Sequence, residues 1–275
     1  MSLESPQASA NESGLREALR IPLSIWLWAE IVVVSIAAFF LAGLALLVCY
    51  PFDRRRAVAG NIVRLACVTA VKLNPMWRFE VRGQLPTHFA RKTVLMSNHC
   101  SHTDPFLICH LPVTMRWLAK ASLFKIPFLG WAMWAVGDIP VRRGDPNSAR
   151  EAMSRCAYWL SQEVAVAAFP EGTRSASGEL LPFKDGAFRL AIETGADILP
   201  LAVTGTHTAL RKHDWRAGYS RGWLNIGTTI STAGMSIEDL PHLRDQVREQ
   251  IIRLRAELIS GDPAQPSLSD GRPLY

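Results

Sequence analysis

The sequence lacks several features that would assign it to a class at once. Its five cysteines are scattered through 275 residues, and no two of them form a Cys-x-x-Cys pair. This pattern argues against a disulfide framework and against a zinc site. Only 20% of the residues are charged, whereas 49% are hydrophobic. The chain is therefore predicted to be folded around a substantial core, and it is slightly more apolar than a typical soluble enzyme.

No nucleic-acid-binding motif is present, so we expect no nucleic-acid partner. The net charge of +6 comes mostly from arginine, whose guanidinium group binds phosphate or carboxylate in bidentate fashion. Such a surface can be simply solvated, or it can bind an anionic lipid or an acidic carrier. His99, His102 and His110 are close in sequence, but no second ligand cluster joins them, and no metal site is predicted.

A long uncharged run lies near the N-terminus. It covers residues 31–52, which is 22 residues, and Glu30 alone separates it from an apolar stretch at 21–29. A helix of about twenty apolar residues can cross a bilayer. Three arginines at 54–56 follow directly, which predicts that this end faces the cytoplasm.

The next segment, 57–73, is also largely apolar. The two segments could therefore form a hairpin that dips into one leaflet without crossing it. A signal peptide and a long buried core helix are further alternatives. We expect the protein to be attached to the cytoplasmic face of the inner or plasma membrane. The sequence is compatible both with a helix that spans the bilayer and with a hairpin that enters one leaflet.

After Pro75 short apolar runs alternate with helical patterns, which predicts an α/β fold with a mostly parallel sheet flanked by helices. The predicted strands are 77–82, 93–97, 138–141, 164–169, 198–203 and 223–230, and the predicted helices begin at 104 or cover 147–161, 185–194 and 236–259. The chain then divides into a polar N-terminal segment (1–20), a membrane-attachment helix or hairpin (21–73), a main domain (74–260) and a flexible tail (261–275).

His99 and Asp104 are the first candidate catalytic residues. Histidine is the side chain best suited to taking a proton near neutral pH, and a carboxylate on one ring nitrogen leaves the other nitrogen as the base. The two residues are five positions apart, and on a straight helix their side chains would not face each other. We expect them to meet where the strand 93–97 passes into a helix, at the edge where open α/β sheets place their sites. This spacing also occurs often by chance.

A second candidate site follows the predicted strand 164–169. Residues 171–175 read Glu-Gly-Thr-Arg-Ser, and exposed backbone N–H groups, the hydroxyl of Thr173 and the guanidinium of Arg174 would together cradle an anion. An ordinary surface turn is the alternative. A base for an alcohol beside a phosphate cradle suggests group transfer to a phosphorylated alcohol.

The motif Asn98-His99-x4-Asp104 followed by residues 169–175 (Phe-Pro-Glu-Gly-Thr-Arg-Ser) resembles the glycerolipid acyltransferase family, most closely the 1-acylglycerol-3-phosphate acyltransferases. Three more blocks resemble family segments: residues 137–143, residues 198–203, and Lys120 with residues 123–130. The resemblance covers roughly residues 75–210, within an acyltransferase domain at 74–260.

The resemblance implies that His99 deprotonates the free hydroxyl of a lysolipid and that Asp104 orients the imidazole. The alkoxide would attack an acyl thioester directly, without an acyl-enzyme. Six positions are implied to bind the acceptor phosphate, with Glu171 bracing the cluster: Lys120, Arg143, Glu171, Gly172, Thr173 and Arg174. The donor would be acyl-CoA or acyl carrier protein, and no cofactor is implied.

The predicted reaction acylates the sn-2 hydroxyl of 1-acylglycerol 3-phosphate to give phosphatidic acid in phospholipid biosynthesis. Two positions differ from the family pattern, because Arg142 stands where an acidic residue is common and Ser122 where glutamate is frequent. Another acceptor, such as a lyso-ornithine lipid or a lysophospholipid with a headgroup, is an alternative. A thioesterase and an inactive lipid-binding protein are further ones.

Overall fold

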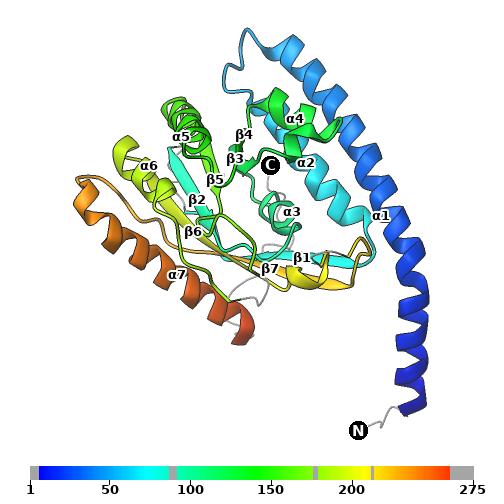
Figure 1. The fold of residues 1–275 in the computed structure, drawn as a ribbon. Helices are drawn as coiled ribbons and strands as arrows, with labels where there is room; N and C mark the ends of the chain where they lie inside the picture. The colour runs from blue at the N-terminus through cyan, green and yellow to red at the C-terminus, as the bar shows by residue number, and fades with distance from the viewer. Residues whose placement is uncertain (1–5, 87–91, 176–178, 212–213, 261–275) are drawn as a thin grey trace.

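The computed structural model describes residues 6–86, 92–175, 179–211 and 214–260, with side chains from Ala18 onward. The predicted flexible tail at 261–275 lies outside these residues. The first helix, α1 (Pro6–Cys49), begins inside the segment 1–20 and continues through the predicted membrane segment. Helix α2 (Ala57–Leu73) follows after a short turn and runs back along α1 (Figure 1).

The described residues form one seven-stranded sheet in the order β1-β7-β6-β2-β5-β3-β4. Its strands are β1 (Trp77–Arg82), β2 (Thr93–Ser97), β3 (Met115–Lys120), β4 (Ile139–Val141), β5 (Ala165–Ala168), β6 (Asp197–Thr204) and β7 (Ser220–Ile226). All neighbouring pairs are parallel except β6 and β7. The predicted mostly parallel α/β sheet is confirmed.

Helices cover both faces of the sheet (Figure 1). Helices α5 (Pro146–Ser161), α6 (Gly186–Thr194) and α7 (Leu240–Ser260) pack on one face, and α3 (Asp104–Ile108) lies on the other. Side chains alternate along a strand, and accordingly Val94 and Met96 of β2 enter the first layer whereas Leu95 enters the second. Both faces of β2 are therefore buried, which explains its continuous apolar sequence.

Two elements of the fold, β3 and α4, were not predicted from the sequence. Strand β3 contains Arg116, a residue that is fully buried against expectation. Its guanidinium donates to the backbone oxygens of Met115, Arg55 and Arg56. Helix α4 (Leu129–Val136) consists of apolar residues and one glycine on all its sides, so it has no amphipathic period to read.

One predicted strand is misplaced. The range 223–230 begins inside β7 (Ser220–Ile226) and extends past its end. The Gly227 amide still donates to the backbone oxygen of Pro200 on β6. Ile230 returns to the sheet only as an isolated bridge to Ile198. The segment 236–259 begins as a 3-10 turn, η3 (Ile237–Asp239), before α7. A second 3-10 turn, η1 (Leu123–Lys125), precedes α4.

Candidate active site

The structure brings His99 and Asp104 together at the end of β2. His99 Nδ1 lies 2.8 Å from Asp104 Oδ2, and the exposed fractions of the two residues are 8% and 0%. Because a carboxylate only accepts hydrogen bonds, Nδ1 carries the proton and Nε2 is left as the basic nitrogen. The strand-end loop and the first turn of α3 produce this contact, as a straight helix could not.

Asp104 is held by several donors besides the imidazole. Its Oδ2 accepts the backbone N–H groups of Cys100 and Ser101, each at 2.8 Å. Its Oδ1 accepts the hydroxyl of Thr206 at 2.5 Å. A fully buried carboxylate needs such donors to remain ionised. The dyad is therefore rigid before any ligand binds.

The imidazole is also fixed from its face and from the preceding residue. The ring of Phe169 stacks on that of His99, with centroids 3.9 Å apart and planes 13° apart. The amide of Asn98 exchanges two hydrogen bonds with the backbone of Val203 on β6, at 2.8 and 3.0 Å. Neighbouring strands thus set the position from which His99 projects.

Glu171 is placed next to the backbone of His99. Its carboxylate is buried and accepts the backbone N–H of His99 at 2.7 Å and that of Leu181 at 2.9 Å. Burial raises the pKa of Glu171, and these two N–H bonds oppose the rise. Both oxygens accept from the protein backbone, so Glu171 braces the loop from which His99 projects.

Three cations gather at this edge of the sheet: Lys120 at the end of β3, Arg143 after β4, and Arg174 after β5. The proximity of Arg174 contributes, with burial, to a lowered pKa of Arg143. No ion pair joins any of the three to a carboxylate within the described residues. Unpaired cations placed together favour an anionic ligand.

His102 lies near both the cations and the dyad. Desolvation, helped by Arg174 and Lys120, lowers the pKa of His102 to about 4. Its imidazole is therefore neutral at physiological pH and adds no repulsion to the cation group. His110, one turn beyond α3, has Nδ1 at 3.0 Å from the carbonyl oxygen of Phe106.

The turn at 171–175 needs glycine at its second position. Gly172 has φ +66°, and a Cβ there would stand 2.9 Å from Cε of Lys184. Any larger residue would be strained and would displace this lysine. Thr173 is exposed beside it. Lys184 is therefore a further cation over the turn, and the sequence reasoning missed it.

Thr206 was also missed. It lies in the 3-10 turn η2 (Thr206–Thr208), more than 100 positions after Asp104. The one available signal was chemical, since a buried carboxylate with two oxygens needs more donors than a single histidine supplies.

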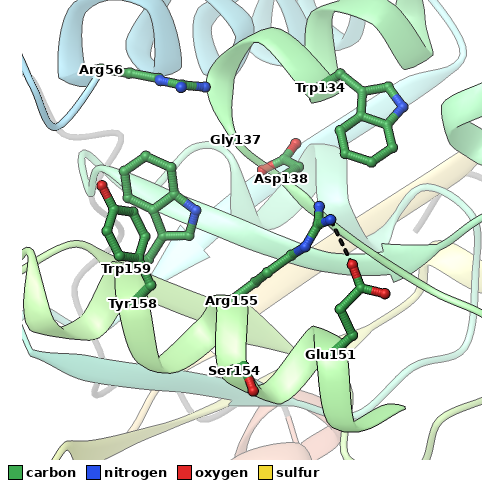
Figure 2. A pocket seen from close by; sticks show the side chains of 9 residues that line it. All are labelled: Arg56, Trp134, Gly137, Asp138, Glu151, Ser154, Arg155, Tyr158 and Trp159. Carbon is green, nitrogen blue, oxygen red and sulfur yellow. Dashed lines mark hydrogen bonds and ion pairs between the residues drawn. The ribbon is translucent and has the colours of Figure 1, made fainter. Parts of the chain in front are cut away.

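The opposite edge of the sheet contains a different group of charges (Figure 2). An open hollow of about 400 Å³ lies where β3 and β4 begin, between α4, α5 and the start of α2. Figure 2 shows Arg155 of α5 reaching across it to Trp134, with an ion pair of 2.7 Å to Glu151. The side chain of Asp138 accepts the backbone N–H of Trp117 at 2.8 Å. These charges are satisfied by protein groups, unlike those at the dyad's edge.

Comparison with known proteins places the dyad and the turn in one family. A sequence profile described as Acyltransferase matches residues 78–204. The 1-acyl-sn-glycerol-3-phosphate acyltransferase alpha of Mus musculus is 34% identical over 222 residues, covering 80% of this chain and 77% of the mouse protein. The chain belongs to the glycerolipid acyltransferase family. Both sequence motifs quoted for the resemblance lie inside the matched region.

Other acyltransferases agree with this placement. The chloroplastic 1-acyl-sn-glycerol-3-phosphate acyltransferase LPAT1 of Arabidopsis thaliana is 34% identical over 182 residues, 64% of this chain. The chain spans about half the length of the chloroplastic relatives it matches. The crystal structure of the LPA acyltransferase PlsC from Thermotoga maritima superposes with a TM-score of 0.71 at 26% identity, covering 89% of this chain and 98% of that one.

Proposed function

We propose that the protein transfers a fatty acyl group from an acyl thioester to the free sn-2 hydroxyl of 1-acylglycerol 3-phosphate, giving phosphatidic acid. The observation that carries the proposal is the 2.8 Å contact between His99 Nδ1 and Asp104 Oδ2. It lies beside three cations that have no carboxylate partner in the part of the chain that the structure describes. The family's 1-acyl-sn-glycerol-3-phosphate acyltransferases support the acceptor.

In the proposed reaction Nε2 of His99 takes the proton of the acceptor hydroxyl as its oxygen attacks the thioester carbonyl carbon. A carbon–oxygen bond forms and the carbon–sulfur bond breaks, and the proton then passes from His99 to the departing thiolate. The reaction yields an ester and a free thiol, with no oxidant, reductant or cofactor required. Asp104 stabilises the imidazolium that exists between the two proton transfers.

Lys120, Arg143 and Arg174 would bind the acceptor phosphate in this scheme. A guanidinium binds a phosphate through two parallel hydrogen bonds, which fixes the orientation of the acceptor as well as its affinity. Gly172 and Thr173 would bring a close backbone approach and a hydroxyl to the same anion. Acyl-CoA or acyl carrier protein is the proposed donor.

We also propose that α1 lies in the cytoplasmic leaflet of the membrane and does not cross the bilayer. The segment Ala18–Cys49 is long and apolar enough to span by length and composition. Its inner side, however, is docked on the folded domain through Leu27, Ala38 and Ala42, all buried. Polar contacts also hold its N-terminal half. Arg20 pairs with Asp214 and donates to the backbone oxygen of Ala217, both at 3.0 Å. The Ser24 hydroxyl accepts the backbone N–H of Ala217 at 2.9 Å, and Trp28 donates to the backbone oxygen of Trp215 at 2.8 Å.

A helix covered along one side by a polar domain can bury only its outer side in lipid. From Ile25 to Val48 that outer side is strongly apolar, and its exposed large residues include Ile25, Val33, Phe40, Leu44, Leu47 and Val48. Trp131 and Trp134 of α4 are exposed as well, and tryptophan is favoured at the membrane interface.

The test is an acyl-transfer assay with the purified full chain in mixed micelles. Acyl-CoA and acyl carrier protein are compared as donors, and lysophosphatidate, lysophosphatidylcholine and a lyso-ornithine lipid as acceptors. We expect lysophosphatidate to be acylated fastest and the activity to be lost in His99→Ala. Transfer to the phosphate-free acceptor alone would contradict the phosphate assignment, and release of free fatty acid without any acceptor would indicate a thioesterase.

A further inference from the structure

We propose that Thr206 is a positioning residue that holds Asp104 in the orientation His99 needs, an inference that rests on the proposed role of the dyad. Thr206 lies two residues beyond the region matched by the acyltransferase profile, which ends at residue 204. It is fully buried and comes from the connection between β6 and β7.

The two oxygens of Asp104 have different partners. Oδ2 accepts from His99 Nδ1 and from the backbone N–H groups of Cys100 and Ser101. Oδ1 accepts the Thr206 hydroxyl at 2.5 Å, and the Cys100 thiol lies farther away at 3.6 Å. Thr206 is therefore the close donor to Oδ1 among the described residues. Without it, a buried anionic oxygen would lack a strong hydrogen bond.

The direction of the hydrogen bonds follows from the protons available. The Thr206 hydroxyl has one proton, and a carboxylate can only accept it. The hydroxyl oxygen is then free to accept from the Cys100 thiol, whose Sγ lies 3.1 Å from Thr206 Oγ1. Burial raises the pKa of the Cys100 thiol, so this group keeps its proton and remains a donor. The chain of bonds runs from Cys100 through Thr206 to Asp104.

Thr206 is held rigidly by the turn that precedes it. Gly205 has φ +77°, and a Cβ at this position would stand 1.8 Å from the carbonyl oxygen of Arg221. Only glycine allows the chain to pass so close to β7. The Ser220 hydroxyl then donates to the Gly205 carbonyl oxygen at 2.8 Å. The hydroxyl of Thr206 is thus presented by fixed backbone.

The test compares Thr206→Val, which is nearly isosteric and lacks the hydroxyl, with Thr206→Ser, which keeps it. Thr208→Val is the matched control, because Thr208 lies on the same turn and its hydroxyl donates to the backbone oxygen of Tyr219 at 2.9 Å, away from the dyad. Each variant of the full chain is characterised by kcat, KM for lysophosphatidate, the pH dependence of kcat and thermal melting.

For T206V we expect kcat to fall about 10-fold or more, with KM within about 2-fold of wild type, because one charge-assisted bond in the dyad is lost. The acid limb of the pH profile should move to higher pH. Without the hydroxyl, the carboxylate's charge is less compensated, it attracts the imidazolium more strongly, and the base is protonated more easily. T206S should restore both properties, and T208V should change neither.

A T206V enzyme with wild-type kcat and pH profile would overturn the inference, and so would a T206S enzyme as impaired as T206V. Should T206V melt below the assay temperature, Thr206→Ala removes the same hydroxyl and is measured in its place. Failure of the dyad itself gives a different result, since His99→Ala would then keep wild-type activity whatever the Thr206 variants do.

Discussion

The two ends of strands β3 and β4 carry similar charged residues, but these residues have different partners. Where β3 and β4 begin, Arg155 pairs with Glu151, and Arg116 donates to backbone oxygens while its guanidinium stacks over Trp159 at 4.7 Å. Where the same strands end, Lys120 and Arg143 have no carboxylate partner within the described residues. Charges satisfied by the protein contribute to the fold, whereas charges left unpaired beside a buried dyad are available to a ligand.

The largest expected effect is on chemistry at the dyad's edge. His99→Ala removes the base, and Asp104→Asn removes the carboxylate that orients it. We expect kcat to fall about 1,000-fold or more in each, with KM for the acceptor little changed. Steady-state kinetics measure this, and circular dichroism spectra matching wild type show that the fold is intact. Retention of a tenth of the activity in His99→Ala would contradict the account.

The second effect is on stability, at the other edge. Arg116→Ala should lower the free energy of unfolding by about 3 kcal/mol, because it leaves a cavity and three backbone oxygens without their donor. Arg155→Ala is the matched control, since Arg155 also stacks on a tryptophan but is half-exposed. We expect it to cost about 0.5 kcal/mol or less. Equal losses in chemical denaturation would show that burial does not distinguish the two arginines.

The third effect is on acceptor binding. Arg174→Gln should raise KM for lysophosphatidate about 10-fold, because a charge-assisted contact to the phosphate is lost. Arg142→Gln is the control from the same edge, since Arg142 already pairs with Asp145 at 2.9 Å. Its KM should stay within about 2-fold of wild type. The KM for a lysolipid without a phosphate should be unchanged in both variants.

A further expected effect is a pH dependence of stability at the hollow. Burial raises the pKa of Asp138 from 3.8 to about 7. Between these values the folded state binds the proton more tightly than the unfolded state, so this group lowers stability as pH rises from about 4 to about 7. Asp138→Asn should remove that component. The melting temperature of wild type minus that of the variant should therefore fall as pH rises through this window. A difference that stays constant with pH would contradict the assignment.

The dyad and the strand before it could be predicted from the sequence. The strand 93–97 is predicted at its full extent, because both of its faces are buried and its three central residues are apolar. The pairing of His99 with Asp104 followed from the strand-to-helix transition between them. Local pattern and motif spacing were sufficient wherever the determining contacts lie within about ten residues.

The remainder depends on contacts between distant segments, which leave no local pattern. Arg116 can be buried in β3 only because the turn before α2 supplies its acceptors. Glu171 and Thr206 act on the dyad across 72 and 102 positions. Glu171 and Thr206 each follow an apolar strand, and many surface residues do the same. Their contacts with the dyad form only because β2, β5 and β6 lie side by side in the sheet.

The most direct test is a crystal structure of the protein with a non-reactive lysophosphatidate analogue. The account predicts the acceptor hydroxyl at hydrogen-bond distance from His99 Nε2, about 2.6–3.2 Å, with the phosphate against Arg174. A phosphate bound instead between Arg56 and Arg155 in the hollow, or a hydroxyl directed away from His99, would contradict it.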